Sequence, residues 1–439
     1  MEKKMAMILM IAAVAAVSIL VCVTPGSDAS VDPEDETAGG SISWMLVSSS
    51  LVLLMIPGLI LFYGGLLRKQ SMSAMIAQSM GGAAVVGLLW VVCGYSLAFG
   101  GDGTFGDFSR LFMEGAIDTA SSGNISELEF AMYQMMFAMI APCLFLGACA
   151  ERMRFPAVIA YMAAWSILIY APLVHFVWDG GFSSMFGDWF QGLDFAGGIA
   201  IHLAAAMAGV VAVKFLGPRK EHIRKLPSHN IPMVFLGTGI LVVGWMGFNG
   251  GGFGTADSYT IHAVINTIVA WLGSTVTWMI IQYSMYGRVS TVGICTGLLA
   301  GLVAITPCAG YVGIPASIFL GICGSVVGYY AISYFHSLKK FDDALDVFAL
   351  HGCVTIFGLL ALGFLADPAV VGEEAEGLIY GGFSLLASQI VMVLFTVVYS
   401  SAISYVILKV ISLFIRVSVT PEEQDMGQDI IEHGERAYQ

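Results

Sequence analysis

Leu193–Ala206, with the sequence LDFAGGIAIHLAAA, begins with one acidic residue, Asp194, and carries one histidine, His202, in an otherwise almost entirely apolar run. On a helix that rises about 1.5 Å per residue, the imidazole lies roughly 12 Å below the carboxylate. An ionisable side chain at that depth in a bilayer is costly, so a functional role is its default interpretation. The stretch therefore predicts a membrane-spanning helix with a polar site inside it.

A second stretch, Leu345–Gly352 (LDVFALHG), repeats this pattern with Asp346 and His351. Taken alone, either histidine is as consistent with a hydrogen-bonded core residue as with a functional one. Their matching places in the two halves of the chain favour the functional interpretation. We predict that the two segments are equivalent and that their histidines meet.

The composition is that of a polytopic membrane protein. The 439 residues have a mean hydropathy of +0.84, and 58% are hydrophobic whereas only 11% are charged. A soluble protein carries about a quarter charged residues. The net charge of −13 argues against nucleic acid as a partner, because phosphate binding needs clustered Lys and Arg.

Eleven apolar stretches are long enough to cross a bilayer. They are residues 42–66, 72–99, 130–150, 156–177, 195–216, 231–250, 261–285, 289–307, 312–335, 347–365 and 379–414, the last being one long helix or one with a bend. An N-terminal segment, residues 1–29, has the charged, apolar and small-residue order of a signal peptide, with a retained transmembrane helix as the alternative.

Loop charges give the orientation. If the first span starts outside, the outward loops hold a single basic residue, Arg110, whereas the inward loops hold most of the others. These are Arg68, Lys69, Arg152, Arg154, Lys214, Arg219, Lys220, Arg224, Lys225, Arg288, Lys339, Lys340 and the tail after Arg416. This distribution follows the positive-inside rule and predicts a cytoplasmic C-terminus.

The expected fold class is all-α, with eleven transmembrane helices arranged as an inverted 5+5 repeat plus one C-terminal helix. Two sets of five spans must lie in opposite orientations, and transporters commonly place their site at the interface of such repeats. We therefore predict a transmembrane domain over residues 30–415 and a cytoplasmic regulatory tail over residues 416–439.

Signatures of soluble enzymes are missing from the sequence. It contains no HExxH, GxSxG, GxxxxGK[ST] or dinucleotide-binding motif, and no Cys/His cluster with zinc spacing. We expect neither enzymatic activity nor a metal or cofactor.

Several motifs, in order along the chain, resemble the ammonium transporter family (Amt/Mep/Rh), on its Amt side. They are Pro57-Gly58 with Leu61-Phe62-Tyr63-Gly64-Gly65-Leu66, Phe137-Ala138-Met139-Ile140, Ala150-Glu151-Arg152-Met153-Arg154-Phe155, Val177-Trp178-Asp179-Gly180-Gly181, Leu193-Asp194-Phe195-Ala196-Gly197-Gly198 with His202, Gly244-Trp245-Met246-Gly247-Phe248-Asn249, Thr306-Pro307-Cys308-Ala309-Gly310-Tyr311, and Asp346-Val347-Phe348 with His351-Gly352. The resemblance extends from the first span to the C-terminus.

The resemblance implies a homotrimer with one hydrophobic pore in each subunit. Trp178 and Phe137 would form the outer site that receives ammonium, and Phe137 and Phe248 would be the stacked rings that obstruct the pore below it. His202 and His351 would line the pore as twin histidines. Without the resemblance, aromatic residues in spans are more often packing or interface residues.

Three further positions follow from the resemblance. Asp194 would be the aspartate near the outer site, which we interpret mainly as a helix N-cap, and Trp245 would line the pore. Gly252 occupies the position where the family commonly has a serine that helps to hold the ion, so the outer site is expected to be weaker or built differently. The tail resembles the regulatory one on which PII-type signalling proteins act.

The function implied is transmembrane ammonium transport. An indole face offers a desolvated cation about 1–2 kcal/mol, far less than the cost of carrying the charge through hydrocarbon, so a neutral species crosses more readily. We therefore expect deprotonation of ammonium, conduction of ammonia and a proton relay through the histidines. The alternatives are an ammonium sensor with little or no transport, and a neutral ammonia channel of the Rh kind.

Overall fold

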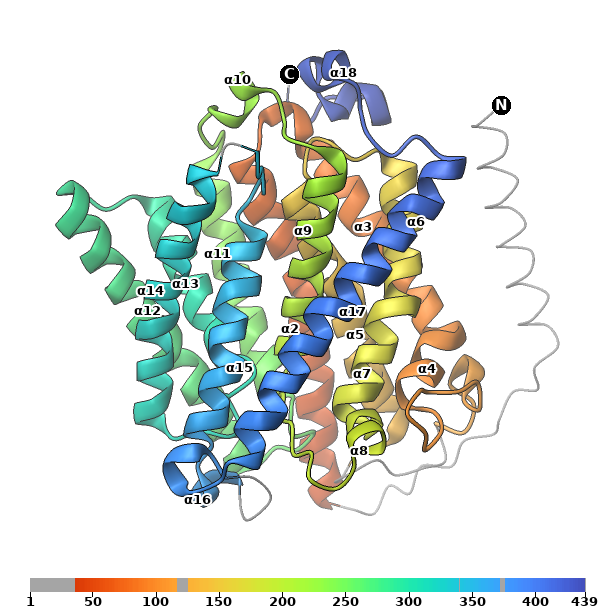
Figure 1. The fold of residues 1–439 in the computed structure, drawn as a ribbon, viewed down its shortest axis with the longest axis vertical. Coiled ribbons are helices and arrows are strands. Elements are labelled where there is room, and N and C mark those ends of the chain that lie inside the picture. Colours follow the sequence, from red (N-terminus) through yellow and green to blue (C-terminus); the bar gives the residue numbers. More distant parts are fainter. Residues whose placement is uncertain (1–35, 117–124, 339, 372–375, 439) are drawn as a thin grey trace.

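The protein is described by a computed structural model over residues 36–116, 125–338, 340–371 and 376–438. This part of the chain is helical, and its only β-type pairing is an isolated antiparallel bridge between Met153 and Ser418. Residues 1–29, for which a signal peptide is predicted, lie outside the described residues. The long helices run side by side along the vertical axis of the molecule (Figure 1).

Each of the eleven predicted stretches coincides with a helix. They are α2 (Glu36–Leu66); α3 (Met72–Leu89) with η2 (Trp90–Gly94) and α4 (Tyr95–Phe99); α5 (Glu127–Cys149); α6 (Phe155–Trp165) with η4 (Ser166–Tyr170) and α7 (Ala171–Trp178); η5 (Gly198–Leu203) with α9 (Ala204–Leu216); α11 (Ile231–Gly250); α12 (Ser258–Tyr286); α13 (Thr291–Ile305); α14 (Ile314–Ser337); η6 (Phe348–Cys353) with α15 (Val354–Leu365); and α17 (Ser384–Phe414). Within the described residues, ten are long and apolar enough to span a membrane, and α13, with 15 residues, is shorter. The last stretch is one continuous helix of 31 residues.

Short helices cap the two ends of the bundle. One end carries η1 (Lys69–Ser71), α10 (Glu221–Arg224), α18 (Pro421–Met426) and η8 (Asp429–His433), and the other carries η3 (Leu111–Met113), α8 (Gly181–Phe186), α16 (Pro368–Val371) and η7 (Leu378–Tyr380). Figure 1 shows α10 and α18 together at the top and α8 and α16 at the bottom. The basic loop residues predicted to face inward therefore gather at the end that also holds the C-terminal tail.

Local sequence explains where several helices begin. Ser126 and Glu129 form a reciprocal capping box at the start of α5, and the side chain of Asn230 accepts a hydrogen bond from the Met233 amide at the start of α11. Asp257 and Ser290 cap α12 and α13 in the same way. Each side chain satisfies an amide that has no partner within its own helix.

The inverted repeat is visible in the two segments that carry the histidines. Both segments, η5 with α9 and η6 with α15, begin with a π-helical turn that contains the histidine. They run in opposite directions, because α9 ends beside α10 and α15 ends beside α16 (Figure 1). The two histidines consequently approach the middle of the bundle from opposite ends.

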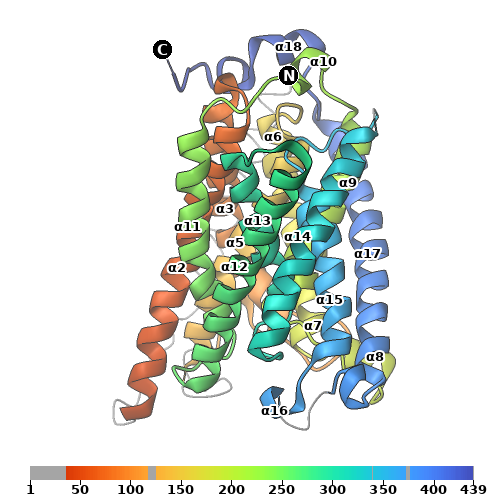
Figure 2. The same cartoon turned by 90° about the vertical axis from the view of Figure 1, so that its left-hand side faces the viewer.

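Small residues allow the closest helix packing. Helices α2 and α11 lie side by side in Figure 2, and a Cβ atom at Gly237 would lie 2.3 Å from the backbone nitrogen of Phe62. A Cβ atom at Gly58 would lie 2.8 Å from Cγ2 of Ile240 across the same contact. Such approaches suit a lipid environment, where van der Waals packing, rather than the hydrophobic effect, associates helices.

Candidate functional site

The two histidines lie in contact. The Nδ1 atoms of His202 and His351 are 3.2 Å apart, and the rings are nearly parallel, with centroids separated by 5.1 Å. Both side chains are buried. A hydrogen bond between two Nδ1 atoms requires one to carry the hydrogen and the other to offer its lone pair, so the pair shares one proton at this contact.

Asp194 fixes the start of the segment that carries His202. Its Oδ1 atom accepts hydrogen bonds from the amides of Gly197 at 3.0 Å and Gly198 at 2.7 Å, and its Oδ2 atom accepts from Ile199 at 2.7 Å. Asp194 therefore satisfies amides at the start of η5 as a capping side chain does, although the N-cap position itself is held by Gly197. Burial raises the pKa of this carboxyl to about 6, although the amide donors act in the opposite direction.

The counterpart of Asp194 in the second repeat is Asp343, and the predicted equivalence with Asp346 is wrong. The Oδ2 atom of Asp343 accepts a hydrogen bond from the Phe348 amide at 2.6 Å at the start of η6. Asp346 instead has a left-handed backbone, with φ of 59°, and contacts His336 at 2.7 Å. Burial raises the pKa of the Asp343 carboxyl to about 7, and the nearby charge of Asp346 adds to this effect.

Spacing is the signal that identifies Asp343. Asp194 and Asp343 each precede their histidine by eight residues, whereas Asp346 precedes His351 by five. The two caps lie on opposite ends of the bundle, as an inverted repeat requires.

Two stacked phenylalanine rings lie next to the histidines. The rings of Phe137 and Phe248 are 4.3 Å apart with an interplanar angle of 29°, and both side chains are buried. Tyr133 donates a hydrogen bond to the carbonyl oxygen of Phe248 at 2.6 Å and so fixes the backbone of one ring. The ring of Trp245 lies 5.6 Å from that of His202 and 5.4 Å from that of Phe248.

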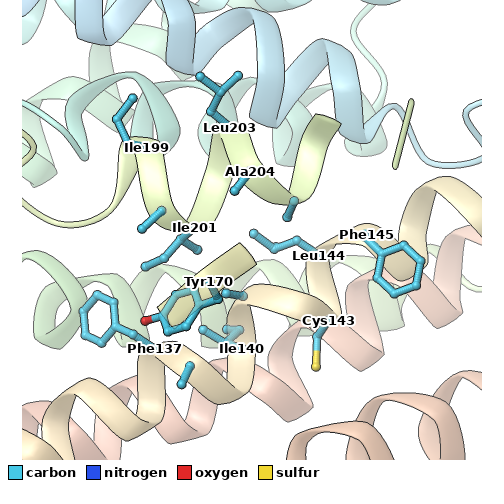
Figure 3. Packing of buried hydrophobic residues seen from close by; sticks show 14 of the residues in the cluster. Phe137, Ile140, Cys143, Leu144, Phe145, Tyr170, Ile199, Ile201, Leu203 and Ala204 are labelled. Carbon is cyan, nitrogen blue, oxygen red and sulfur yellow. The ribbon is translucent and has the colours of Figure 1, made fainter. Parts of the chain in front are cut away.

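A narrow apolar cavity of about 20 Å³ adjoins the histidines. A single water needs about 10–15 Å³ by the same measure, so the space suits only very small molecules. Ile140 and Leu144 of α5 and Ile201 of η5 form part of its wall, and Figure 3 shows these packed elements. Trp245 also lines this cavity, as predicted, and its Nε1 atom donates to Thr306 Oγ1 at 2.9 Å.

A larger pocket of about 220 Å³ opens at the end of the bundle that holds Asp194. Four residues predicted for the outer region line it together: Phe137, Trp178, Asp194 and Gly252. The Trp178 indole donates to the carbonyl oxygen of Asp194 at 2.7 Å. The structure thus places the pocket, the stacked rings and the histidines next to one another.

Gly252 lies against a phenylalanine that the sequence reasoning did not single out. An ideal Cβ atom at Gly252 would lie 2.7 Å from Cζ of Phe195, and one at Gly310 would lie 2.2 Å from Cε2 of the same ring. The Phe195 ring is therefore held between two glycines and occupies the space beside position 252. Phe253 and Tyr311 pack against it.

A buried ion-pair network lies at the opposite end. Glu151 contacts Arg68 at 2.7 Å and Arg219 at 3.0 Å, and Asp342 contacts Arg219 at 2.9 Å and Arg152 at 3.7 Å. Burial alone would raise the pKa of Glu151, but the two guanidinium groups hold it below its usual value. Loops from four regions of the chain are joined here, those that hold Arg68, Glu151 with Arg152, Arg219 and Asp342.

The C-terminal segment docks on this network. Arg68 donates to the carbonyl oxygen of Gln424 at 2.9 Å, and Gln428 donates to that of Met153 at 2.7 Å. The Asp429 carboxylate accepts from the Ala74 amide at 2.9 Å, at the start of α3. The tail is thereby tied to the starts of two spanning helices.

Apolar helices long enough to span a membrane, with an outer aromatic pocket next to a narrow apolar cavity and paired histidines, are typical of a membrane transporter or channel. A sequence profile of the Ammonium Transporter Family matches residues 43–438. The chain belongs to this family.

Known proteins resemble the chain over nearly its whole length. The ammonium transporter of Aquifex aeolicus is 41% identical over 403 residues, covering 91% of this chain and 93% of the relative. Ammonium transporter 1 of Dictyostelium discoideum is 38% identical and covers 91% and 87%. The crystal structure of Saccharomyces cerevisiae Mep2 matches with a TM-score of 0.79 at 30% identity, covering 88% of each chain.

Proposed function

We propose that this protein carries ammonium across the membrane as ammonia and a separately transferred proton. The observation that carries this proposal is the order of the site: an aromatic pocket, then the Phe137–Phe248 stack, then a narrow apolar cavity that adjoins two hydrogen-bonded histidines. Family membership supports ammonium as the substrate.

The chemistry follows from the surroundings. In the outer pocket the aromatic faces of Trp178 and Phe137 attract a small cation as it loses water. The narrow apolar cavity disfavours the intact ion, so ammonium releases its proton near the stacked rings and ammonia passes on. The shared proton of His202 and His351 offers a relay for the charge.

An ammonium pulse on purified protein in liposomes tests this proposal. A saturable current supports coupled movement of ammonia and a proton. Flux of ammonia without current would instead support a neutral channel of the Rh kind, and ammonium binding without flux would support a sensor. Either of these two results would overturn the electrogenic mechanism.

We propose that the protein lies in the plasma or inner membrane, with the end that carries α10 and α18 facing the cytoplasm. The gathering of basic loop residues at that end supports this orientation.

We further propose a homotrimer and a PII-type signalling protein that binds at the docked tail. Native mass spectrometry tests the trimer, and co-purification with and without residues 416–439 tests the partner.

A further inference from the structure

We propose that the side-chain oxygen of Gln134 is the hydrogen-bond acceptor that binds the cation in the outer pocket. This inference rests on the proposed function, because it names the residue that gives the ammonium site its polar contact. Gln134 lies on α5, one turn before Phe137, and lines the pocket together with Trp178.

Gln134 is buried and its side-chain oxygen is unsatisfied. Its side chain is 7% exposed, and within the part of the chain that the structure describes its Oε1 atom has no hydrogen-bond partner. A buried acceptor without a partner costs free energy, so its presence in a pocket points to a ligand that supplies the donor.

Other polar groups on the pocket wall are already engaged. The Tyr133 hydroxyl donates to the Phe248 carbonyl, and the Trp178 indole donates to the Asp194 carbonyl. Both carboxylate oxygens of Asp194 accept backbone amides. Asp194 therefore shapes the potential of the pocket, while Gln134 holds an unused acceptor.

Position 252 cannot supply this contact. Gly252 has no hydroxyl, and the ring of Phe195 occupies the space into which a side chain would extend. Gln134, which lies on helix α5, supplies the polar contact that the loop position 252 lacks. Rotation of the side-chain amide by 180° exchanges its oxygen and nitrogen, and the orientation that turns the oxygen toward the pocket presents the acceptor to the cation.

Methylated ammonium ions separate a hydrogen bond from simple aromatic attraction. The pocket of about 220 Å³ has room for ions larger than ammonium. Trimethylammonium retains one N–H donor, whereas tetramethylammonium has none, although both are cations with apolar surfaces. An acceptor at Gln134 therefore favours the first ion, while the aromatic rings attract both.

The experiment measures the binding of ammonium, trimethylammonium and tetramethylammonium to the purified full-length protein by calorimetry. It compares the unmodified protein with Gln134→Met, which keeps the length of the side chain, and with Gln134→Glu, which restores an oxygen. Ammonium-evoked current in liposomes is recorded for all three proteins.

Gln134→Met is expected to weaken binding of ammonium and trimethylammonium about tenfold or more while leaving tetramethylammonium unchanged. Gln134→Glu restores the preference for trimethylammonium. Thermal stability of Gln134→Met is expected to equal or exceed that of the unmodified protein, because an unpaired buried acceptor has been removed. A merely structural role would lower stability and affect all three ions alike.

Equal weakening of all three ions, or none, in Gln134→Met would overturn the inference and leave the proposed function intact if current persists. A protein that binds ammonium through Gln134 but passes no current would retain the inference and overturn the proposed transport. A protein that neither binds nor conducts ammonium would overturn both.

Discussion

Substituting Gly252 by serine supplies the hydroxyl that the family commonly has at this position, yet we predict that it damages the site. The new Cβ atom would lie 2.7 Å from Cζ of Phe195, 3.0 Å from Cε1 and 3.2 Å from Cε2. The ring cannot retreat freely, because it also lies closely against Gly310, where a Cβ atom would be 2.2 Å from Cε2.

Overpacking against the buried ring of Phe195 costs about 1–3 kcal/mol. For a chain of this length, the entropy of unfolding translates that loss into a decrease in Tm of about 1–4 °C. The displaced ring would also enter the outer pocket, so ammonium binding should weaken in Gly252→Ser rather than improve.

Scanning fluorimetry and calorimetric ammonium titration measure the two effects. Gly239→Ser is the matched control on α11, because nothing lies within 4 Å of an ideal Cβ atom there. Combining Gly252→Ser with Phe195→Leu makes room for the hydroxyl and should recover much of the lost stability. The reasoning is refuted if Gly252→Ser alone is as stable as Gly239→Ser and binds ammonium more tightly than the unmodified protein.

Three further predictions concern the charged and titratable groups. Replacing either His202 or His351 by leucine should abolish or alter the ammonium-evoked current, and an unchanged current would exclude them from the mechanism. Folding raises the pKa of the Asp343 carboxyl to about 7. Between about pH 4 and pH 7 the folded protein therefore keeps a proton that the unfolded chain releases, so the contribution of Asp343 to stability falls as the pH rises through this range. The Tm of Asp343→Asn relative to the unmodified protein should therefore increase from pH 4 to pH 7, and a constant difference would contradict this. Glu151→Gln removes the carboxylate partner of the buried Arg68 and leaves Arg219 paired with Asp342 alone, so it should cost about 3–5 kcal/mol, visible as a lowered Tm; no loss would show that the network is dispensable.

Most of the fold could be predicted from hydropathy, because an apolar run long enough to cross a bilayer has few other stable conformations. The stretch 231–250 coincides with α11, and 72–99 spans α3, η2 and α4. The π-helical turns of η5 and η6 were not predicted, since hydropathy does not distinguish them from α-helix.

The candidate site was only partly predictable. The histidines, the stacked rings and Trp178 belong to motifs that can be recognised in the sequence, and the structure places them together. Asp343 was missed because Asp346 directly precedes the apolar run, although the eight-residue spacing to the histidine already identifies Asp343 and its hydrogen bond to the Phe348 amide agrees. Gln134 could not be identified from the sequence, because only the three-dimensional packing shows that its buried Oε1 atom has no hydrogen-bond partner among the described residues.

The most direct test of the account is the current evoked by an ammonium pulse in liposomes that contain the unmodified protein, with His202→Leu measured alongside. The account predicts a saturable inward current in the unmodified protein that is lost or altered in the variant. Ammonia flux without any current in the unmodified protein would contradict the separate transfer of a proton through the paired histidines.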